Sequence, residues 1–199
     1  MEHYFSEHQK SPFRLQKIHF NLNGIDFEFN TAAGVFSYKR IDKGTELLIK
    51  KAIIKPNWSI LDLGCGYGCI GIIIGKLFPD CNIIMIDINR RACKLAKMNI
   101  TANEVNNVEI RQGDLFSAIH EKFNTILVNP PQTAGKKLCY KIIEKSYNYL
   151  EKGGLLQLVA RHNTGGKELE KKMKEVFGNV RDIAKKGGYR VYLSKKLKS

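Results

Sequence analysis

The stretch of this chain best suited to binding chemistry is a glycine-rich turn between an apolar run and a helical pattern. It reads Ser59-Ile-Leu-Asp-Leu-Gly-Cys-Gly-Tyr-Gly-Cys-Ile-Gly71. Glycine permits positive φ and lets a ligand approach the backbone closely, and the free N–H groups of the following helix point at that ligand. The turn therefore predicts a nucleotide-like ligand at the carboxyl end of the first strand.

Two ligand classes compete for this turn. The spacing Gly66-x-Gly68-x-x-Gly71, followed by Asp87 at the end of the next expected strand, satisfies the dinucleotide fingerprint and keeps NAD open. However, Asp62 lies two residues before Gly64. A carboxylate there would attract a ligand with an ammonium and a sulfonium group and would repel a pyrophosphate. This favours S-adenosyl-L-methionine.

A second candidate site is Asn129-Pro130-Pro131, at the end of another expected strand. Proline holds the residue before it extended, so this strand end is rigid. The Asn129 amide oxygen and the Pro130 carbonyl can then accept both hydrogens of an NH2 group and turn its lone pair toward an electrophile. Methyl transfer depends on in-line positioning, which can supply about 7–11 kcal/mol of a barrier. We therefore predict that Asn129, Pro130 and Pro131 are catalytic.

The elements that position these motifs alternate between strands and helices. This alternation predicts a Rossmann-like, doubly wound α/β fold with a mostly parallel seven-stranded sheet and a C-terminal antiparallel hairpin. Strands are expected at 58–63, 82–87, 108–112, 125–129 and 155–160, helices at 68–78, 89–102, 136–150 and 167–177, and the closing hairpin at 180–184 and 189–193.

The N-terminal part has a different pattern. Residues 17–30 alternate apolar and polar on both sides of Asn23-Gly24, which predicts a β-hairpin. Residues 1–16 lack apolar periodicity and suggest a loosely attached arm, and a helix is expected over 46–54. We divide the chain into an arm and hairpin extension at 1–45 and a sheet domain at 46–199.

The composition indicates a polyanionic partner. The chain has 199 residues, 33 Lys and Arg against 19 Asp and Glu, and a net charge of +14. Such an excess favours RNA or DNA. There is neither a signal-peptide pattern nor a run of about 20 apolar residues, so we expect a cytoplasmic protein that does not enter a membrane. The five cysteines form no CxxC pair and have no suitably spaced histidines, so we expect reduced thiols and no metal.

Taken together, the motifs resemble those of class I S-adenosylmethionine-dependent methyltransferases. The matching residues are Leu61-Asp-Leu-Gly-Cys-Gly-Tyr-Gly68, Asp87, Gly113-Asp114-Leu115 and Asn129-Pro130-Pro131. Thr31-x-x-Gly34-Val-Phe-Ser37 and Asp42-x-Gly44-Thr45 narrow the match. These resemble the small-subunit ribosomal RNA guanine-N2 methyltransferases (RsmC-like), in particular their single-domain archaeal-type members. The resemblance identifies the sheet domain, 46–199, as a class I methyltransferase domain.

The resemblance implies roles at the matching positions. The turn would face the methionine part of the cofactor, Asp87 the ribose hydroxyls, and Asp114 the adenine amino group with Leu115 beside the ring. Asn129 and Pro130 would hold the target NH2 group. The cofactor-binding residues expected on this basis are Asp62, Gly64, Cys65, Gly66, Asp87, Ile88, Asp114, Leu115 and Asn129.

The chain departs from the family at Gln132, where many relatives carry an aromatic residue that stacks on the target base. Phe36 or Tyr38 would then supply the ring. Lys136 and Lys137 fall in the first turn of a helix, where cations oppose the helix dipole unless a phosphate passes nearby. The expected substrate-binding residues are Phe36, Gln132, Lys136, Lys137 and Arg161.

We therefore expect an S-adenosylmethionine-dependent methyltransferase that acts on an exocyclic amino nitrogen of RNA, with guanine N2 of rRNA as the first choice. Alternatives are a tRNA substrate, adenine N6, and a protein glutamine amide. From other classes, an NAD-dependent oxidoreductase and an inactive RNA-binding relative also stay open. The sequence does not distinguish a monomer from a homodimer.

Overall fold

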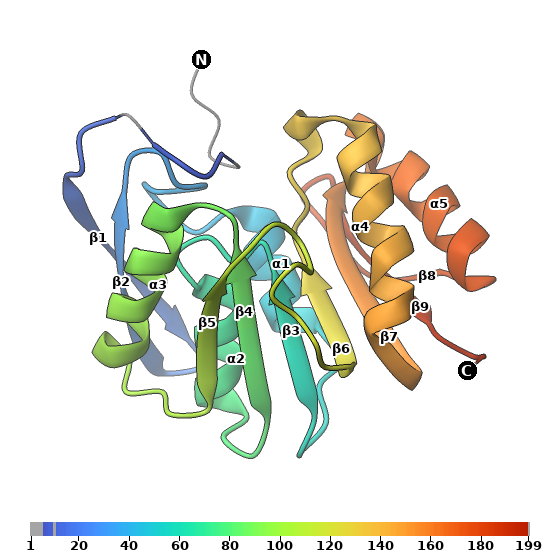
Figure 1. Cartoon of the computed structure of the whole chain (residues 1–199), viewed down its shortest axis with the longest axis horizontal. Coiled ribbons are helices and arrows are strands. Elements are labelled where there is room, and N and C mark those ends of the chain that lie inside the picture. Colours follow the sequence, from blue (N-terminus) through green and yellow to red (C-terminus); the bar gives the residue numbers. More distant parts are fainter. Residues whose placement is uncertain (1–5, 10, 199) are drawn as a thin grey trace.

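A single seven-stranded sheet forms the centre of the protein (Figure 1). The computed structural model describes residues 6–9 and 11–198. The strand order is β5-β4-β3-β6-β7-β9-β8, with β3 to β7 parallel and β9 antiparallel to both of its neighbours. The bounds are β3 Ser59–Leu63, β4 Asn82–Asp87, β5 Val108–Gln112, β6 Phe123–Val128, β7 Leu150–Arg161, β8 Arg181–Lys186 and β9 Tyr189–Lys195.

This order confirms the predicted fold class. The chain runs from β3 outward to β5 and then returns to the other side of β3 with β6. The direction of winding therefore reverses between β3 and β6. In parallel α/β sheets, ligands bind at the carboxyl ends of the strands beside such a reversal.

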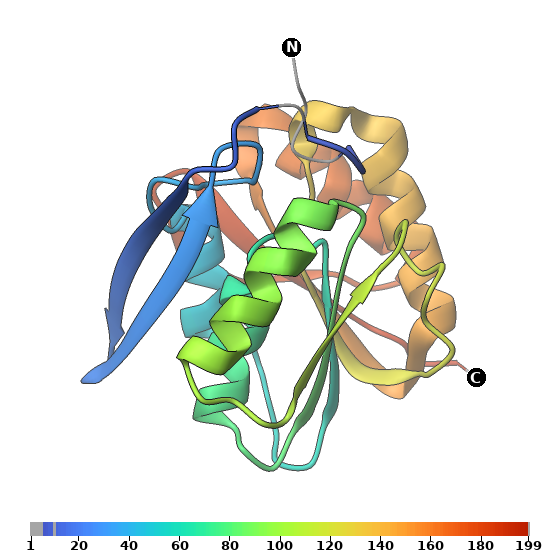
Figure 2. The same cartoon turned by 60° about the vertical axis from the view of Figure 1, so that its left-hand side comes forward.

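Helices cover both faces of the sheet and produce two apolar cores (Figures 1 and 2). Neighbouring residues on β3 alternate between the cores, because successive side chains of a strand point to opposite faces. Ile60 belongs to the core with α1, α2 and α3, and Leu61 to the core with α4 and α5. The helices are α1 Lys43–Lys51, α2 Cys69–Leu77, α3 Arg90–Ala102, α4 Lys136–Tyr149 and α5 Lys167–Phe177, with short helical turns η1 Gln132–Ala134 and η2 His162–Gly166.

The predicted N-terminal hairpin is present as β1 Leu15–Leu22 and β2 Ile25–Ala32. Its turn residues Asn23 and Gly24 have φ of 52° and 83°, as the favoured two-residue hairpin turn requires. The hairpin lies beside α3 (Figure 2). The buried Asn99 of α3 accepts from the Asn30 backbone N–H at 2.7 Å and donates to the carbonyls of Asn30 and Tyr67 at 3.0 and 2.9 Å. One side chain thus joins the hairpin to the glycine-rich turn.

The expected loose attachment of the N-terminal arm is wrong for its described part. The Arg91 guanidinium donates to the carbonyls of Gln9 and Ser11 at 3.3 and 2.6 Å, and the Arg90 N–H donates to the Glu7 carbonyl. These bonds hold residues of the arm at the start of α3. Residues 1–5 and 10 lie outside the described part, and the division at 45/46 stays a prediction.

Several element boundaries also differ from those expected, most clearly the starts of α1 and β7. Helix α1 begins at Lys43, three residues early, because the Asp42 carboxylate accepts from the backbone N–H groups of Gly44 and Thr45 and caps the helix. Strand β7 begins at Leu150, five residues early, and continues through Gly153 and Gly154. Within the described residues, no helix combines the length and apolar character needed to cross a bilayer.

Candidate active site

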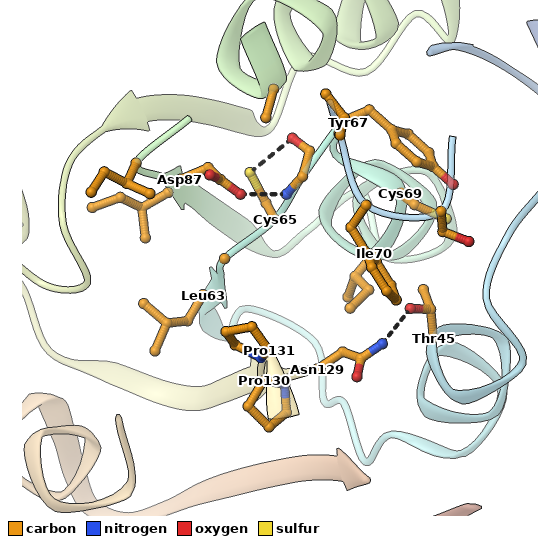
Figure 3. Close-up of a pocket in the computed structure, with 18 of the residues that line it drawn as sticks. Thr45, Leu63, Cys65, Tyr67, Cys69, Ile70, Asp87, Asn129, Pro130 and Pro131 are labelled. Carbon is orange, nitrogen blue, oxygen red and sulfur yellow. Dashed lines mark hydrogen bonds between the residues drawn. The ribbon is translucent and has the colours of Figure 1, made fainter. Parts of the chain in front are cut away.

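A cavity opens at the carboxyl ends of β3, β4 and β6, at the reversal of the sheet (Figure 3). The segment before α1, the glycine-rich turn, the ends of β4 and β6, residues 113–115 and α4 all contribute to its wall. The structure brings together these residues predicted from the sequence: Phe36, Gly64, Cys65, Gly66, Asp87, Ile88, Asp114, Leu115, Asn129, Pro130 and Pro131.

The glycine-rich turn is fixed to β4 by its own backbone. The N–H groups of Gly64 and Cys65 donate to the Ile86 carbonyl at 2.9 and 3.1 Å. Gly68 precedes α2 with φ of 91°, and a Cβ there would lie 2.9 Å from the Ile72 side chain. Glycine is required at this position for both reasons.

Asp87 stabilises the turn from the end of β4. Its Oδ2 accepts from the Gly66 N–H and its Oδ1 from the Asn89 N–H, both at 2.8 Å. Burial raises the pKa of Asp87 to about 6, against the opposing effect of these backbone donors. Each carboxylate oxygen has room for a further donor, so Asp87 can also accept from a hydroxyl of a ligand. Asp114, across from it along the same edge of the sheet, is exposed to solvent and lines the cavity.

Asp62 lies beneath the turn and is not among the residues that line the cavity. It is 1% exposed, and its Oδ2 accepts from the Gly71 N–H at 2.9 Å, in the first turn of α2. Its Oδ1 finds no hydrogen-bond partner within the described chain. Burial raises the pKa of Asp62 to about 7, and the charge of Asp87 adds to the increase. Its expected contact with methionine stays a prediction.

The Asn-Pro-Pro motif forms a rigid turn after β6. Pro131 has φ −72° and ψ 80°, and the Gln132 N–H donates to the Pro130 carbonyl at 2.8 Å. These values describe an inverse γ-turn. The Pro130 carbonyl keeps one of its two acceptor positions, because a carbonyl oxygen has two lone pairs.

The side chain of Asn129 is oriented by the segment before α1. Its Nδ2 donates to Thr45 Oγ1 at 2.9 Å and to Asp42 Oδ2 at 3.2 Å. Figure 3 shows Asn129 reaching Thr45 on one side of the cavity, away from Asp87. Because both amide hydrogens are used, the Oδ1 atom is the group that Asn129 can offer to a substrate.

Comparison with known proteins identifies the family. The family model described as the methyltransferase small domain matches residues 26–193. The chain belongs to the methyltransferase small domain family. Membership of this methyltransferase family confirms the predicted cofactor, S-adenosyl-L-methionine, and decides against the nicotinamide alternative.

The relatives of this methyltransferase include both short and long proteins. The Bacillus subtilis protein YbxB is 40% identical over 98% of this chain and 99% of its own length. The ribosomal RNA small subunit methyltransferase C of Psychromonas ingrahamii is 35% identical over 70% of this chain and 41% of its own length. The corresponding protein of Haemophilus influenzae (strain KW20) is 35% identical over 80% of this chain and 48% of its own length. The chain thus spans about half the length of the curated methyltransferases it matches.

Solved structures show the same fold. The Thermus thermophilus 16S rRNA N2 methyltransferase RsmC, in complex with AdoMet and guanosine, superposes with a TM-score of 0.82 over 93% of this chain and 51% of its own. The two sequences are 20% identical over that region. The superposition therefore supports the Rossmann-like methyltransferase architecture.

Gln132 stands where the resemblance leads us to expect an aromatic residue, and in this structure its side chain bonds to the backbone. Its Nε2 donates to the Thr164 carbonyl at 2.9 Å and its Oε1 accepts from the Arg161 N–H at 3.1 Å. The side chain therefore joins η1 to the end of β7. Gln132 does not line the cavity.

The remaining predicted substrate-binding residues, Lys136, Lys137 and Arg161, are not among the residues that line the cavity. Lys136 and Lys137 are exposed at the start of α4, and Lys136 approaches Glu168 at 3.9 Å. Arg161, at the end of β7, places its guanidinium 4.7 Å from the centre of the Tyr189 ring. In the part of the chain that the structure describes, no group of three or more His, Cys, Asp and Glu could hold a metal.

Several residues of the cavity wall had no predicted role. Asp42 and Thr45 were named only as part of the resemblance, and Tyr67, Cys69 and Ile70 only as members of the glycine-rich turn. The signal for Asp42 was local, since Asp before a helical pattern is a preferred N-cap residue.

Proposed function

We propose that this protein transfers a methyl group from S-adenosyl-L-methionine to an exocyclic amino nitrogen of RNA, with guanine N2 of rRNA as the first substrate. The observation that carries the proposal is that Asn129 uses its amide nitrogen on Asp42 and Thr45, which leaves its amide oxygen for a substrate, and that the next residue in the chain, Pro130, has a carbonyl fixed by the Gln132 N–H. The names of the relatives support the choice of rRNA and of N2.

The residues around the turn suit the cofactor. Asp87 can accept from the ribose hydroxyls and Asp114 from the adenine amino group. Backbone at Gly64–Gly66 would face the methionine part, with Asp62 as its nearest buried carboxylate. When bound, S-adenosyl-L-methionine supplies an electrophilic methyl group on a sulfonium. These assignments use two of the three carboxylates that line the cavity, Asp87 and Asp114, and the backbone of the glycine-rich turn.

The target nitrogen would be held by two acceptors. Asn129 Oδ1 and the second lone pair of the Pro130 carbonyl accept one hydrogen each of an NH2 group. The nitrogen lone pair is then less delocalised into the ring of the base and is available for in-line attack. Positioning of this kind can account for several kcal/mol of a barrier, about 7–11 in favourable cases. As the C–N bond forms, the methyl–sulfur bond breaks and S-adenosylhomocysteine is left, and the methylated nitrogen then loses one proton to solvent water. His162 is bonded through Nδ1 to the Tyr192 hydroxyl at 2.7 Å, and no proton transfer is assigned to it.

The charge of the protein favours RNA over a protein substrate. The net charge is +14, and Lys136, Lys137 and Arg161 lie exposed near the end of β6 and β7 where the target would enter. Phosphates along the strand would neutralise these cations and release counterions. With Gln132 bonded to the backbone, we assign the contact with the base to Phe36, which lines the cavity and is 37% exposed, whereas the other lining aromatic residue, Tyr67, is 4% exposed.

The test is labelled methyl transfer into total RNA from cells that lack this protein, followed by nucleoside analysis. We expect N2-methylguanosine in the rRNA fraction. N6-methyladenosine, or label in tRNA or in protein, would replace the proposed substrate by one of the alternatives. No transfer, despite tight binding of S-adenosylhomocysteine by calorimetry, would indicate an inactive RNA-binding relative.

Asn129→Ala is the first variant to compare. It should lower the transfer rate by about 100-fold or more, because it removes one of two acceptors at the reacting nitrogen. Its affinity for S-adenosylhomocysteine should stay within about twofold, since the neighbouring backbone is unchanged. Asn106→Ala is a suitable control, because Asn106 is exposed and precedes β5 at the opposite end of the sheet. An Asn129→Ala protein that keeps its activity would contradict the role given to Asn129.

A further inference from the structure

The Asn129 amide is held by Asp42, a carboxylate that the proposed chemistry does not itself use. We propose that Asp42 is a positioning residue: its carboxylate forces Asn129 to present its oxygen, and not its NH2 group, to the target nitrogen. This inference rests on the proposed function. It assigns a task to a side chain 87 positions away in the sequence.

The chemistry of the two partners explains why Asp42 decides the orientation. An amide can rotate by half a turn and exchange its oxygen and nitrogen, so its orientation follows from the surrounding hydrogen bonds. The Thr45 hydroxyl can donate or accept and would tolerate either state. A carboxylate can only accept. In the rotated state the Asn129 oxygen would face Asp42 Oδ2, which lies 3.2 Å from Nδ2 in the structure. The Asn129 NH2 group would then face the target NH2 group, donor against donor.

Asp42 is itself held from two sides. Its Oδ2 also accepts from the N–H groups of Gly44 and Thr45 at 2.8 and 3.1 Å, at the start of α1. Its Oδ1 accepts from the Tyr189 hydroxyl at 3.1 Å. Because three other donors hold this carboxylate in place, it cannot follow Asn129 if the amide rotates.

The support continues to the rim of the cavity. The Tyr189 hydroxyl accepts from Arg161 Nε at 3.1 Å, and the Arg161 guanidinium stacks on the Tyr189 ring. The ring packs on Gly44, where a Cβ would lie 2.7 Å from it. An unbroken series of hydrogen bonds thus links Arg161, a predicted RNA contact, to Asn129. It also explains the Asp42-x-Gly44-Thr45 motif, since each named residue contacts Asn129 or the group that holds Asp42.

The experiment must separate positioning from helix capping, because Asp42 does both. Asp42→Ser keeps a good N-cap but removes the acceptors for Asn129 and Tyr189, whereas Asp42→Ala removes the cap as well. We expect kcat to fall about 100-fold in both variants, as for a misaligned reacting group. The melting temperature should fall clearly only in Asp42→Ala. If Asp42→Ser has the kcat of the wild type while Asp42→Ala does not, Asp42 acts only as a helix cap and the proposal is wrong.

A second measurement does not require activity. The side-chain NH2 signals of Asn129 in an ¹⁵N–¹H spectrum can be assigned by their absence in Asn129→Ala. In Asp42→Ser, exchange of these protons with water should speed up by about tenfold or more, because one partner is lost and the amide can rotate. Unchanged exchange in Asp42→Ser would overturn the proposal.

The hairpin offers a matched control. Asn21 Nδ2 donates to Asp26 Oδ1 at 2.7 Å, and both residues are exposed. Asp26→Ser should alter the Asn21 signals alone and leave kcat unchanged.

The proposed function and the positioning role of Asp42 can also be refuted separately. A wild-type protein that methylates no RNA but loses Asn129 protection in Asp42→Ser would refute the proposed function and keep the positioning role.

Discussion

Replacing Asp62 with asparagine should change how the stability of this protein depends on pH. Burial raises the pKa of Asp62 from 3.8 to about 7. Between these values the folded protein holds a proton that the unfolded chain has lost, so the free energy of unfolding falls as the pH rises. The slope approaches about 1.4 kcal/mol per pH unit well below pH 7 and fades above pH 7, so the fall from about pH 5.5 to pH 8 is about 2 kcal/mol in total.

Asparagine keeps an oxygen for the Gly71 N–H but cannot titrate. It leaves an NH2 group near the place of Oδ1, and the cost of that group is the same at every pH. The free energy of unfolding of Asp62→Asn minus that of the wild type should therefore be about 2 kcal/mol larger at about pH 8 than at about pH 5.5. Urea unfolding at both pH values, with equal m-values, gives this difference.

Asp80→Asn serves as the control, because Asp80 is exposed to solvent. It should follow the wild type at both pH values. If Asp62→Asn also follows the wild type, the Asp62 carboxyl does not titrate in this range, and the argument from its burial is refuted. A separate loss of affinity for S-adenosylhomocysteine in Asp62→Asn would support the expected contact with methionine.

Two further predictions concern α3 and the end of β4. Asn99→Ala removes the partners of backbone groups in Asn30 and Tyr67, which should lower the free energy of unfolding by about 2–3 kcal/mol. Amide hydrogen exchange should show β2 losing protection first, and equal loss across the sheet would contradict a local role. Under the proposed ribose contact, affinity for S-adenosylhomocysteine should fall as the pH drops below about 6, because protonation of Asp87 removes an acceptor. Calorimetry across this range should show a flat, weaker profile for Asp87→Asn, and a flat wild-type profile would refute the contact.

The fold and the core of the site could be predicted because their signals are local. The glycine-rich turn, Asp87 and Asn129-Pro130-Pro131 each carry their chemistry within a few residues. The alternation of strands and helices then brings the ends of β3, β4 and β6 to one edge of the sheet. A parallel sheet guarantees this meeting, whatever the details of the loops.

The contacts that orient the site could not be predicted in the same way. Asn129 meets Thr45 across 84 positions, and Asn99 meets Asn30 across 69. Such pairs depend on where the segment before α1 and the hairpin pack, which no local pattern specifies. The bonds of Gln132 could not be predicted for the same reason. Its partners, Thr164 and Arg161, come near Gln132 only when β7 has joined the sheet. The described part of the arm was misjudged because its attachment depends on Arg91 and not on apolar periodicity.

The inverse γ-turn at Pro131 has a consequence for how this enzyme can evolve. The Pro130 carbonyl is fixed by two proline rings and by the Gln132 N–H, so the acceptor pair cannot widen or tilt to receive a different base. Adaptation to a new substrate must then come from the other wall of the cavity, the segment from Val35 to Ser37, which carries Phe36. Under the proposed function, Asn129 and Pro130 would determine which chemical group reacts, and the segment from Val35 to Ser37 would be where mutations can change which molecule presents that group.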